Sequence, residues 1–203
     1  METLIGIACN DFVILASDMT HVNSLFVLKN DEDKLYRISK KLIMTVTGEA
    51  GDTVQFAEYI AKNIQLYKMR NGYELSPKAA ATYTRRNLAE YLRSRTPYNV
   101  NLMLGGYDEK EGASLYLIDY LASMIQVPFT TNGYGGLITL SILDRYYKPD
   151  LTEDGAYNLI LKCVQEIHKR LVLNLPNFKV TVVNKDGIKN LPDITPRTEP
   201  ICN

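Results

Sequence analysis

Residues 1–18 constrain the fold more than any other segment of this chain. After two residues the sequence enters an apolar run, Thr3 to Cys9, and beyond a short turn a second apolar run, Phe12 to Ser17, ends at Asp18. Chain ends are usually polar and frayed, whereas these residues have the composition of buried strands. The sequence therefore predicts an N-terminus that lies at a fixed place in the fold. A fixed terminus can take part in chemistry, because its α-amine titrates near neutral pH.

Length and composition fit one globular domain. The 203 residues are 46% hydrophobic and 23% charged, as expected for a single well-buried core. Lys plus Arg and Asp plus Glu each total 23, and this balance argues against nucleic-acid binding, which favours a basic excess. We expect no signal peptide, because no basic region precedes an apolar run. No apolar stretch reaches the roughly 18 residues that cross a bilayer.

Hydrophobic periodicity predicts strands, two helices, strands, two helices and final strands. Asn71-Gly72 ends the first helix, Ser76-Pro77 begins the second, and Thr152 caps the fourth. Each helix pair needs a sheet face on which to bury its apolar stripe. The predicted fold is therefore α+β, a four-layer α/β/β/α sandwich of two antiparallel sheets between two helical layers. It forms a single domain over residues 1–203, with an irregular, Pro-containing tail from about residue 191 that we hypothesise reaches a neighbouring subunit.

Several boundaries are predicted in more detail. Asp52 and Gln55 match a capping box at the start of the first helix. A strand is predicted over Ser24–Leu28 and another near Ile125–Phe129. The Gly-rich loop Asn132–Gly136 precedes the third helix, where it could either cradle an anion or make a tight turn that permits close packing. We favour the turn, because Ile138 interrupts the GxGxxG pattern.

The residue types that most often carry chemistry show no catalytic or metal-binding motif. His21 and His168, the only histidines, stand outside any such motif, so structural roles are predicted for both. Cys9, Cys163 and Cys202 are widely spaced and lack a CxxC pattern, which predicts free thiols in a reducing compartment, the cytoplasm or nucleus. We expect no cofactor and no metal site.

Charged residues stand out at two places. Arg85, Arg86, Arg93 and Arg95 make the second helix basic, which indicates a solvated or subunit-facing surface rather than a nucleic-acid site. Asp18 and Lys34 each lie at the end of an apolar strand near the fixed terminus. Together with that terminus they indicate a nucleophile site or its remnant.

Several short motifs follow the pattern of a known family. The start Thr3–Ile7, "ILASD" (Ile14–Asp18), Lys34 and "TGEAGD" (Thr47–Asp52) resemble the corresponding residues of proteasome β subunits. The resemblance covers essentially the whole chain and implies the sandwich fold predicted above. Four longer runs narrow the resemblance to the non-catalytic type-2 branch, which fills the fourth position of the eukaryotic β ring: "GEAGDTVQFAEYI" (Gly48–Ile60), "LYKMRNGYELSP" (Leu66–Pro77), "LRSRTPY" (Leu92–Tyr98) and "SILDRYY" (Ser141–Tyr147).

Active members of this family are N-terminal nucleophile hydrolases, in which an exposed Thr hydroxyl attacks the peptide carbonyl and a nearby Lys and Asp tune the site. Alignment on Asp18 and Lys34 puts Glu2, which has no hydroxyl, at the position of that Thr. The resemblance implies further departures: Tyr134 stands in place of a supporting Ser, and Arg170 and Leu173 fall near an expected Asp and Ser. It therefore implies a chain with no catalytic residue.

One alternative is a free-standing monomeric binding domain, and another is an active threonine hydrolase in which trimming exposes Thr3. That terminus would be one residue out of register with Asp18 and Lys34, and a one-residue shift along a strand turns the side chain to the opposite face. The resemblance favours a structural subunit of the 20S core particle, with proteasome α and β subunits as its partners in a hetero-oligomeric barrel. It implies neither nucleic-acid nor membrane binding, and a location in the cytoplasm and nucleus.

Overall fold

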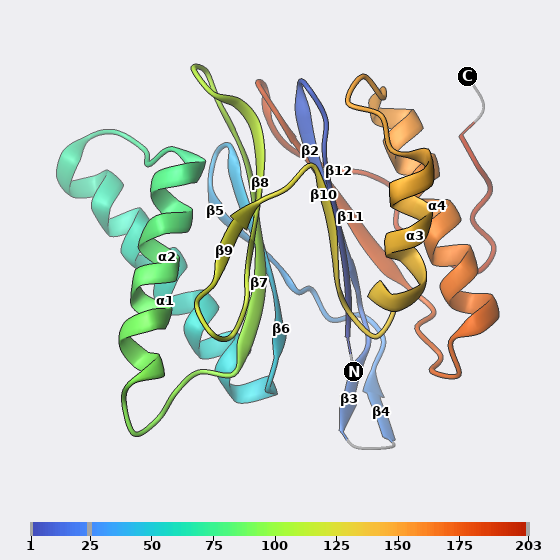
Figure 1. Cartoon of the computed structure of the whole chain (residues 1–203), viewed down its shortest axis with the longest axis horizontal. Coiled ribbons are helices and arrows are strands. Elements are labelled where there is room, and N and C mark those ends of the chain that lie inside the picture. Colours follow the sequence, from blue (N-terminus) through green and yellow to red (C-terminus); the bar gives the residue numbers. More distant parts are fainter. Residues whose placement is uncertain (1, 24–25, 202–203) are drawn as a thin grey trace.

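A computed structural model describes residues 2–23 and 26–201 and has the four layers that the sequence predicts (Figure 1). One five-stranded antiparallel sheet has the order β10-β1-β2-β11-β12, and the other has the order β5-β6-β7-β8-β9. Helices α1 and α2 cover the second sheet, and α3 and α4 cover the first. The strands are β1 (Thr3–Ala8), β2 (Phe12–Asp18), β3 (His21–Asn23), β4 (Phe26–Lys29), β5 (Leu35–Ser39), β6 (Leu42–Gly48), β7 (Val100–Asp108), β8 (Gly112–Ile118), β9 (Met124–Gln126), β10 (Phe129–Gly133), β11 (Phe178–Asn184) and β12 (Gly187–Asn190), and the helices are α1 (Ala50–Asn71), α2 (Pro77–Leu92), α3 (Gly136–Tyr146) and α4 (Glu153–Arg170).

Alternation along β1 divides its side chains between two layers of the core. Ile5 and Ile7 belong to the apolar cluster under α4, whereas Leu4 belongs to the cluster between the two sheets. Odd-numbered positions of β1 therefore face the helices and even-numbered positions face the second sheet, as the period of a strand requires. This division decides where the side chains at the start of β1 point.

The helix boundaries follow local chemistry. Ser76 Oγ accepts a hydrogen bond from the Ala79 N–H at 3.3 Å, and Thr152 Oγ1 accepts one from the Gly155 N–H at 3.1 Å, as N-caps do. The predicted capping box at Asp52 is wrong. Helix α1 begins after Glu49, which makes no side-chain cap, and the Asp52 carboxylate accepts a hydrogen bond from the Asn99 N–H at 2.9 Å. Asp52 thus fixes the loop before β7.

Two strand predictions need correction. The strand expected near Ile125–Phe129 is two strands: β9 pairs with β8 in one sheet, and β10 pairs with β1 in the other. The strand expected over Ser24–Leu28 is part of the β3–β4 hairpin, and residues 24–25 lie outside the described residues. Both errors arise because a short apolar run does not show which sheet will pair with it.

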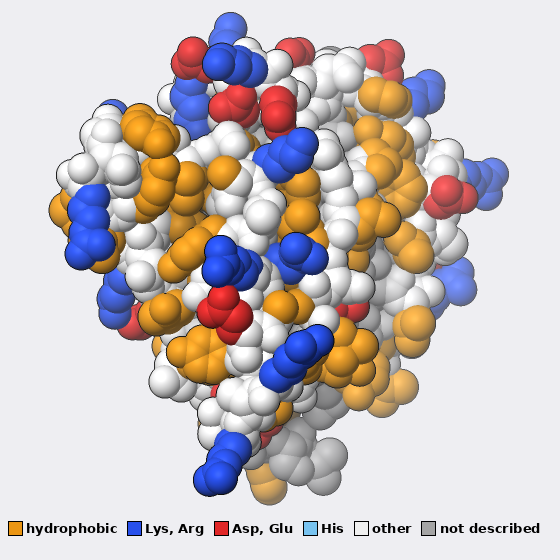
Figure 2. Space-filling model, turned by 60° about the vertical axis from the view of Figure 1, so that its left-hand side comes forward, with side chains coloured by type: hydrophobic (Ala, Val, Ile, Leu, Met, Phe, Trp, Pro, Cys, Tyr) orange, Lys and Arg blue, Asp and Glu red, His pale blue; other side chains and the backbone are white. Residues whose placement is uncertain are grey.

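The β3–β4 hairpin projects from the end of the sandwich where the chain begins (Figure 1). Its strand β4 exposes three successive apolar side chains, with 74% of Phe26, 50% of Val27 and 62% of Leu28 accessible. On the face drawn in Figure 2, Lys and Arg side chains are spread among hydrophobic ones rather than gathered in one basic patch. No helix within the described ranges is long and apolar enough to cross a membrane.

Beyond β12 the chain has little regular structure, and through Ile201 it contacts its own domain. Ile194 is fully buried and forms a backbone bridge with Phe178. The Asn158 side chain on α4 exchanges two hydrogen bonds with the backbone of Ile201, each of 2.9 Å. The hypothesis that this tail reaches a neighbouring subunit stays a prediction.

Candidate functional site

Asp18 and Lys34 form a buried ion pair. Lys34 Nζ lies 2.8 Å from Asp18 Oδ2 and donates a second hydrogen bond, also of 2.8 Å, to the Thr20 carbonyl oxygen. The Asp18 side chain is completely buried and the Lys34 side chain is 6% exposed. Asp18 also accepts hydrogen bonds from the backbone N–H groups of Thr3 (2.7 Å) and Thr20 (3.1 Å). A buried carboxylate is stable only with such compensation, so these contacts fix the pair beside the start of β1.

The Glu2 carboxylate lies against this pair. Its Oε1 is 3.3 Å from Lys34 Nζ, and its Oε2 accepts a hydrogen bond from the Gly48 N–H at 3.0 Å. Glu2 precedes β1, whereas Lys34 precedes β5 and Gly48 ends β6, so the contacts join the two sheets at one end of the sandwich. The role of Gly48 in this site is not predicted from the sequence. The only available signal was the glycine in "TGEAGD" at the junction of a strand and a helix.

Thr3 points into a different layer. Its side chain is fully buried, and its Oγ1 accepts a hydrogen bond from the Gly135 N–H at 3.1 Å. This is the helix-facing side of β1, shared with Ile5 and Ile7. The structure thus places the hydroxyl as strand alternation predicts, away from the side on which Glu2 meets Lys34.

The glycines of the Asn132–Gly136 segment allow α3 to approach the start of β1. Gly133 has φ +84°, and a Cβ there would lie 1.8 Å from the Glu2 carbonyl oxygen; a Cβ on Gly135 would lie 2.5 Å from Thr3 Cγ2. The Tyr134 N–H donates to that same Glu2 carbonyl oxygen at 3.2 Å. These contacts support the interpretation of the segment as a turn for close packing. Its first part, through Gly133, is the end of strand β10 rather than loop.

The other candidate residues lie apart from this site. Arg170 on α4 pairs with Glu166 at 2.9 Å, and Leu173 follows that helix. His21 Nδ1 lies 2.7 Å from Glu32 Oε2, and His168 Nε2 is 2.8 Å from the Leu175 carbonyl oxygen, so both imidazoles have local structural partners. Helix α2 ends at Leu92, so Arg93 caps it and Arg95 lies beyond it, contrary to the prediction that both belong to the helix. Arg86, which is on the helix, pairs with Glu90 on the solvent side.

Two of the three cysteines are free and buried, and Cys202 lies outside the described residues. Burial, assisted by the charge of Asp150, raises the pKa of the Cys9 thiol to about 11. Burial also raises the pKa of the Cys163 thiol to about 12, against the opposing charge of Lys162. Because the thiolate is the reactive form, both behave as apolar core residues rather than nucleophiles.

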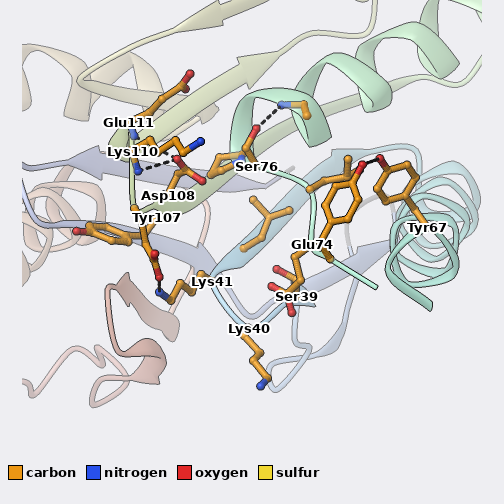
Figure 3. Close-up of a pocket in the computed structure, with 16 residues that line it drawn as sticks. Ser39, Lys40, Lys41, Tyr67, Glu74, Ser76, Tyr107, Asp108, Lys110 and Glu111 are labelled. Atoms are coloured by element: carbon orange, nitrogen blue, oxygen red, sulfur yellow. Dashed lines mark hydrogen bonds and ion pairs between the residues drawn. The ribbon is translucent and has the colours of Figure 1, made fainter. Parts of the chain in front are cut away.

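A cleft of about 790 Å³ lies at the other end of β5 and β6, between the β5–β6 turn, the α1–α2 loop and the β7–β8 turn (Figure 3). Lys41 Nζ lies 3.3 Å from Glu109 Oε1, and the hydroxyls of Tyr67 and Tyr73 are 2.6 Å apart. The Asp108 carboxylate accepts the backbone N–H groups of its own turn. These polar groups are engaged with one another, so we place no reaction in this cleft.

Comparison with known proteins agrees with the geometry. The profile of the proteasome subunit family matches residues 1–183. Proteasome subunit beta type-4 of Saccharomyces cerevisiae is 45% identical over 194 residues, covering 95% of this chain and 98% of the relative. Proteasome subunit beta type-2-A of Arabidopsis thaliana is 44% identical over 190 residues, covering 94% and 93%. Proteasome subunit beta type-2 of Caenorhabditis elegans is 42% identical over 197 residues, covering 96% and 99%.

These matches confirm the resemblance drawn from the sequence motifs, including its narrowing to the type-2 branch. The alignments cover nearly the full length of this chain and of each relative. The sandwich fold, the buried Asp18–Lys34 pair and the fixed first strand are consistent with these matches. This chain belongs to the proteasome subunit family, with the β type-2 and type-4 subunits among its relatives.

Proposed function

We propose that this chain is a non-catalytic β subunit of the 20S proteasome core, holding one position in a β ring and helping to wall the chamber in which proteins are degraded. The observation that carries the proposal is the Glu2 carboxylate, 3.3 Å from Lys34 Nζ, in the place where an active member presents a hydroxyl. A Glu side chain has no hydroxyl for nucleophilic attack. We assign no catalytic, cofactor-binding or metal-binding residue.

The rival is an active threonine hydrolase with Thr3 exposed by trimming. Such an enzyme needs the hydroxyl within reach of a base and of the bound substrate. The Thr3 side chain is instead fully buried and bonded to the Gly135 N–H. Activating it would require β1 to slip by one residue, which would also move Leu4 and Ile5 into the wrong layers.

Intact mass and active-site labelling separate the two functions. We expect the chain from purified particles to have a mass that includes Glu2, and a mechanism-based probe for N-terminal Thr to leave it unlabelled. The catalytic subunits of the same particle provide the internal control, because the probe must label them. A terminus at Thr3 together with probe attached to Thr3 would overturn the proposal.

The partners follow from the same proposal. Other α and β subunits would cover the exposed apolar groups, including the β4 side chains, in a hetero-oligomeric barrel, with no role for nucleic acid or a membrane. Buried free thiols at Cys9 and Cys163 are compatible with the cytoplasm and nucleus. In size-exclusion chromatography of cell extract, we expect the chain to elute with a large particle. A stable monomer in that extract would instead favour a free-standing binding domain.

A further inference from the structure

The contacts of Glu2 are those of a bound ligand. Each carboxylate oxygen has its own donor: Oε1 faces the Lys34 ammonium at 3.3 Å, and Oε2 accepts the Gly48 N–H at 3.0 Å. One cation and one backbone N–H, supplied by the opposite sheet, thus hold one carboxylate. The Gly48 contact is a charge-assisted hydrogen bond, one of the stronger kinds in proteins, and the Lys34 contact is an ion pair.

The binding groups are held in place without Glu2. Lys34 Nζ is fixed by Asp18 Oδ2 and by the Thr20 carbonyl oxygen, each at 2.8 Å. Gly48 is fixed by pairing of β6 with β7 and has φ +148°, and a Cβ there would lie 2.1 Å from the Asn99 carbonyl oxygen. Shortening the Glu2 side chain would therefore leave both donors close to their present positions.

Those donors would then need another acceptor. Lys34 Nζ donates hydrogen bonds to Asp18 and Thr20 and makes an ion pair with Glu2. Without the Glu2 carboxylate, the ammonium loses one of its two carboxylate partners and the Gly48 N–H loses its acceptor. Gly48 lies at the surface, so water or a small anion has to take the place of the carboxylate. The Glu2 side chain is 22% exposed, so the position it fills is open to a small solute.

We propose that Lys34 and the Gly48 N–H form a carboxylate-binding site that the chain fills with its own Glu2, and that the site accepts a free carboxylate once Glu2 is shortened. Tethering gives Glu2 a high effective concentration, so the native chain excludes an external carboxylate. The proposal concerns binding alone and holds whether or not the assembled chain is catalytically silent.

Acetate is the probe, because it reproduces the carboxylate and adjoining carbon of the missing side chain. We would prepare the full chain as wild type, Glu2→Ala and Glu49→Ala. Glu49 is a matched control: it adjoins Gly48, is exposed and makes no side-chain cap. Thermal unfolding is followed in acetate and in chloride at equal ionic strength and pH. For Glu2→Ala, the folding equilibrium constant should rise about tenfold when acetate reaches about ten times its Kd, whereas the other two chains should respond alike and weakly.

Two further measurements locate the effect. Acetate should shift the amide resonance of Gly48 in Glu2→Ala, and the added change Lys34→Met should abolish the acetate response. Trimethylacetate, which is too bulky for the space of one side chain, should be ineffective. If Glu2→Ala fails to fold in chloride, the readout becomes its refolding yield, which acetate should restore above that in chloride. An acetate effect on Glu2→Ala no larger than on Glu49→Ala, or no restored yield, would overturn the proposal.

Discussion

The Thr3 hydroxyl and the Gly135 N–H are joined by a hydrogen bond of 3.1 Å in a fully buried position. The neighbouring residue, Glu2, directs its side chain toward Lys34 on the other side of the strand. Thr3, the first residue of β1, and Glu2, which precedes it, thus serve two layers: Thr3 secures the turn into α3, and Glu2 contacts the second sheet. The hydroxyl that adjoins Glu2 in sequence is thus used in packing.

The first prediction tests whether the Thr3 hydroxyl has a structural role. Thr3→Val keeps the shape of the side chain but leaves the Gly135 N–H without its acceptor, so the free energy of unfolding should fall by about 1–3 kcal/mol. Denaturant unfolding of the full chain measures the change, with Thr82→Val on the exposed face of α2 as the control. Particles assembled with Thr3→Val should retain every peptidase activity. Loss of one activity would contradict a structural role for Thr3.

The second prediction concerns the buried ion pair. Asp18→Ala leaves the Lys34 charge and two backbone N–H groups without their acceptor, so stability should fall by about 3–5 kcal/mol. The control is Glu109→Ala, which removes the exposed pair with Lys41 and should cost less than about 1 kcal/mol. If urea unfolding gave similar losses of stability for Asp18→Ala and Glu109→Ala, the buried ion pair of Asp18 would not be what stabilises this region.

The third prediction concerns the turn between β10 and α3. Gly133→Ala introduces a Cβ 1.8 Å from the Glu2 carbonyl oxygen at φ +84°, so β10 must move away from β1. Backbone strain alone should destabilise the chain by about 1–3 kcal/mol. Gly51→Ala, at the start of α1 with nothing within 4 Å of the new Cβ, should instead stabilise it by about 0.5–1 kcal/mol. The opposite order of unfolding midpoints would contradict the packing role of Gly133.

The fourth prediction is a loss of stability in alkali. Burial raises the pKa of Cys9 to about 11 and of Cys163 to about 12, from an ordinary value of 9.0. Above pH 9 the unfolded thiols ionise while the folded ones keep their protons, so the unfolded state binds fewer protons and stability decreases with rising pH. Urea midpoints measured from about pH 8 to about pH 10.5 should decline less steeply in the Cys9→Ala/Cys163→Ala double variant than in wild type. Equal slopes would show that these thiols do not contribute.

The fifth prediction concerns the C-terminal tail. Asn158→Ala removes both hydrogen bonds to Ile201, so amide exchange over residues 196–201 should quicken while exchange in β11 stays slow. Asn63→Ala, which removes an exposed hydrogen bond within α1, is the control. Unchanged exchange in Asn158→Ala would show that the Asn158 side chain does not hold the tail in place.

Deleting residues 196–203 tests whether the tail contacts a neighbouring subunit. This deletion leaves the buried Ile194 in place, so it disturbs the fold of the chain less than a deletion that begins at Leu191.

Sequence predicted the parts of the fold that rest on periodicity and caps. The four-layer sandwich, the N-caps Ser76 and Thr152 and the end of α1 at Gly72 were all foreseen, because these signals are local. The split of the segment after β8 into β9 and β10 was not, because pairing partners are set by the whole sheet. The pattern at Asp52 predicts a helix cap, whereas its partner in the structure, the Asn99 N–H, is 47 residues away in sequence and leaves no local signal.

In the candidate site, too, features with a local sequence signal were predictable, and features set by distant parts of the chain were not. The pair Asp18 and Lys34 was singled out because charged residues at the ends of apolar strands are unusual, and the opposite facing of Glu2 and Thr3 followed from strand period. The Gly48 N–H was missed because every residue except proline has that donor. Only the three-dimensional fold shows which of these donors meets a carboxylate.

The β3–β4 hairpin has a consequence for the supply of this chain in a cell. Phe26, Val27 and Leu28 are exposed side by side on a strand, and such a surface is prone to association with whatever reaches it first. A chain synthesised when no partner subunit is available would expose this apolar strand to the other proteins of the cell. If neighbouring subunits cover the hairpin, as we propose, a chain made in excess of them would keep these side chains exposed and be prone to aggregate.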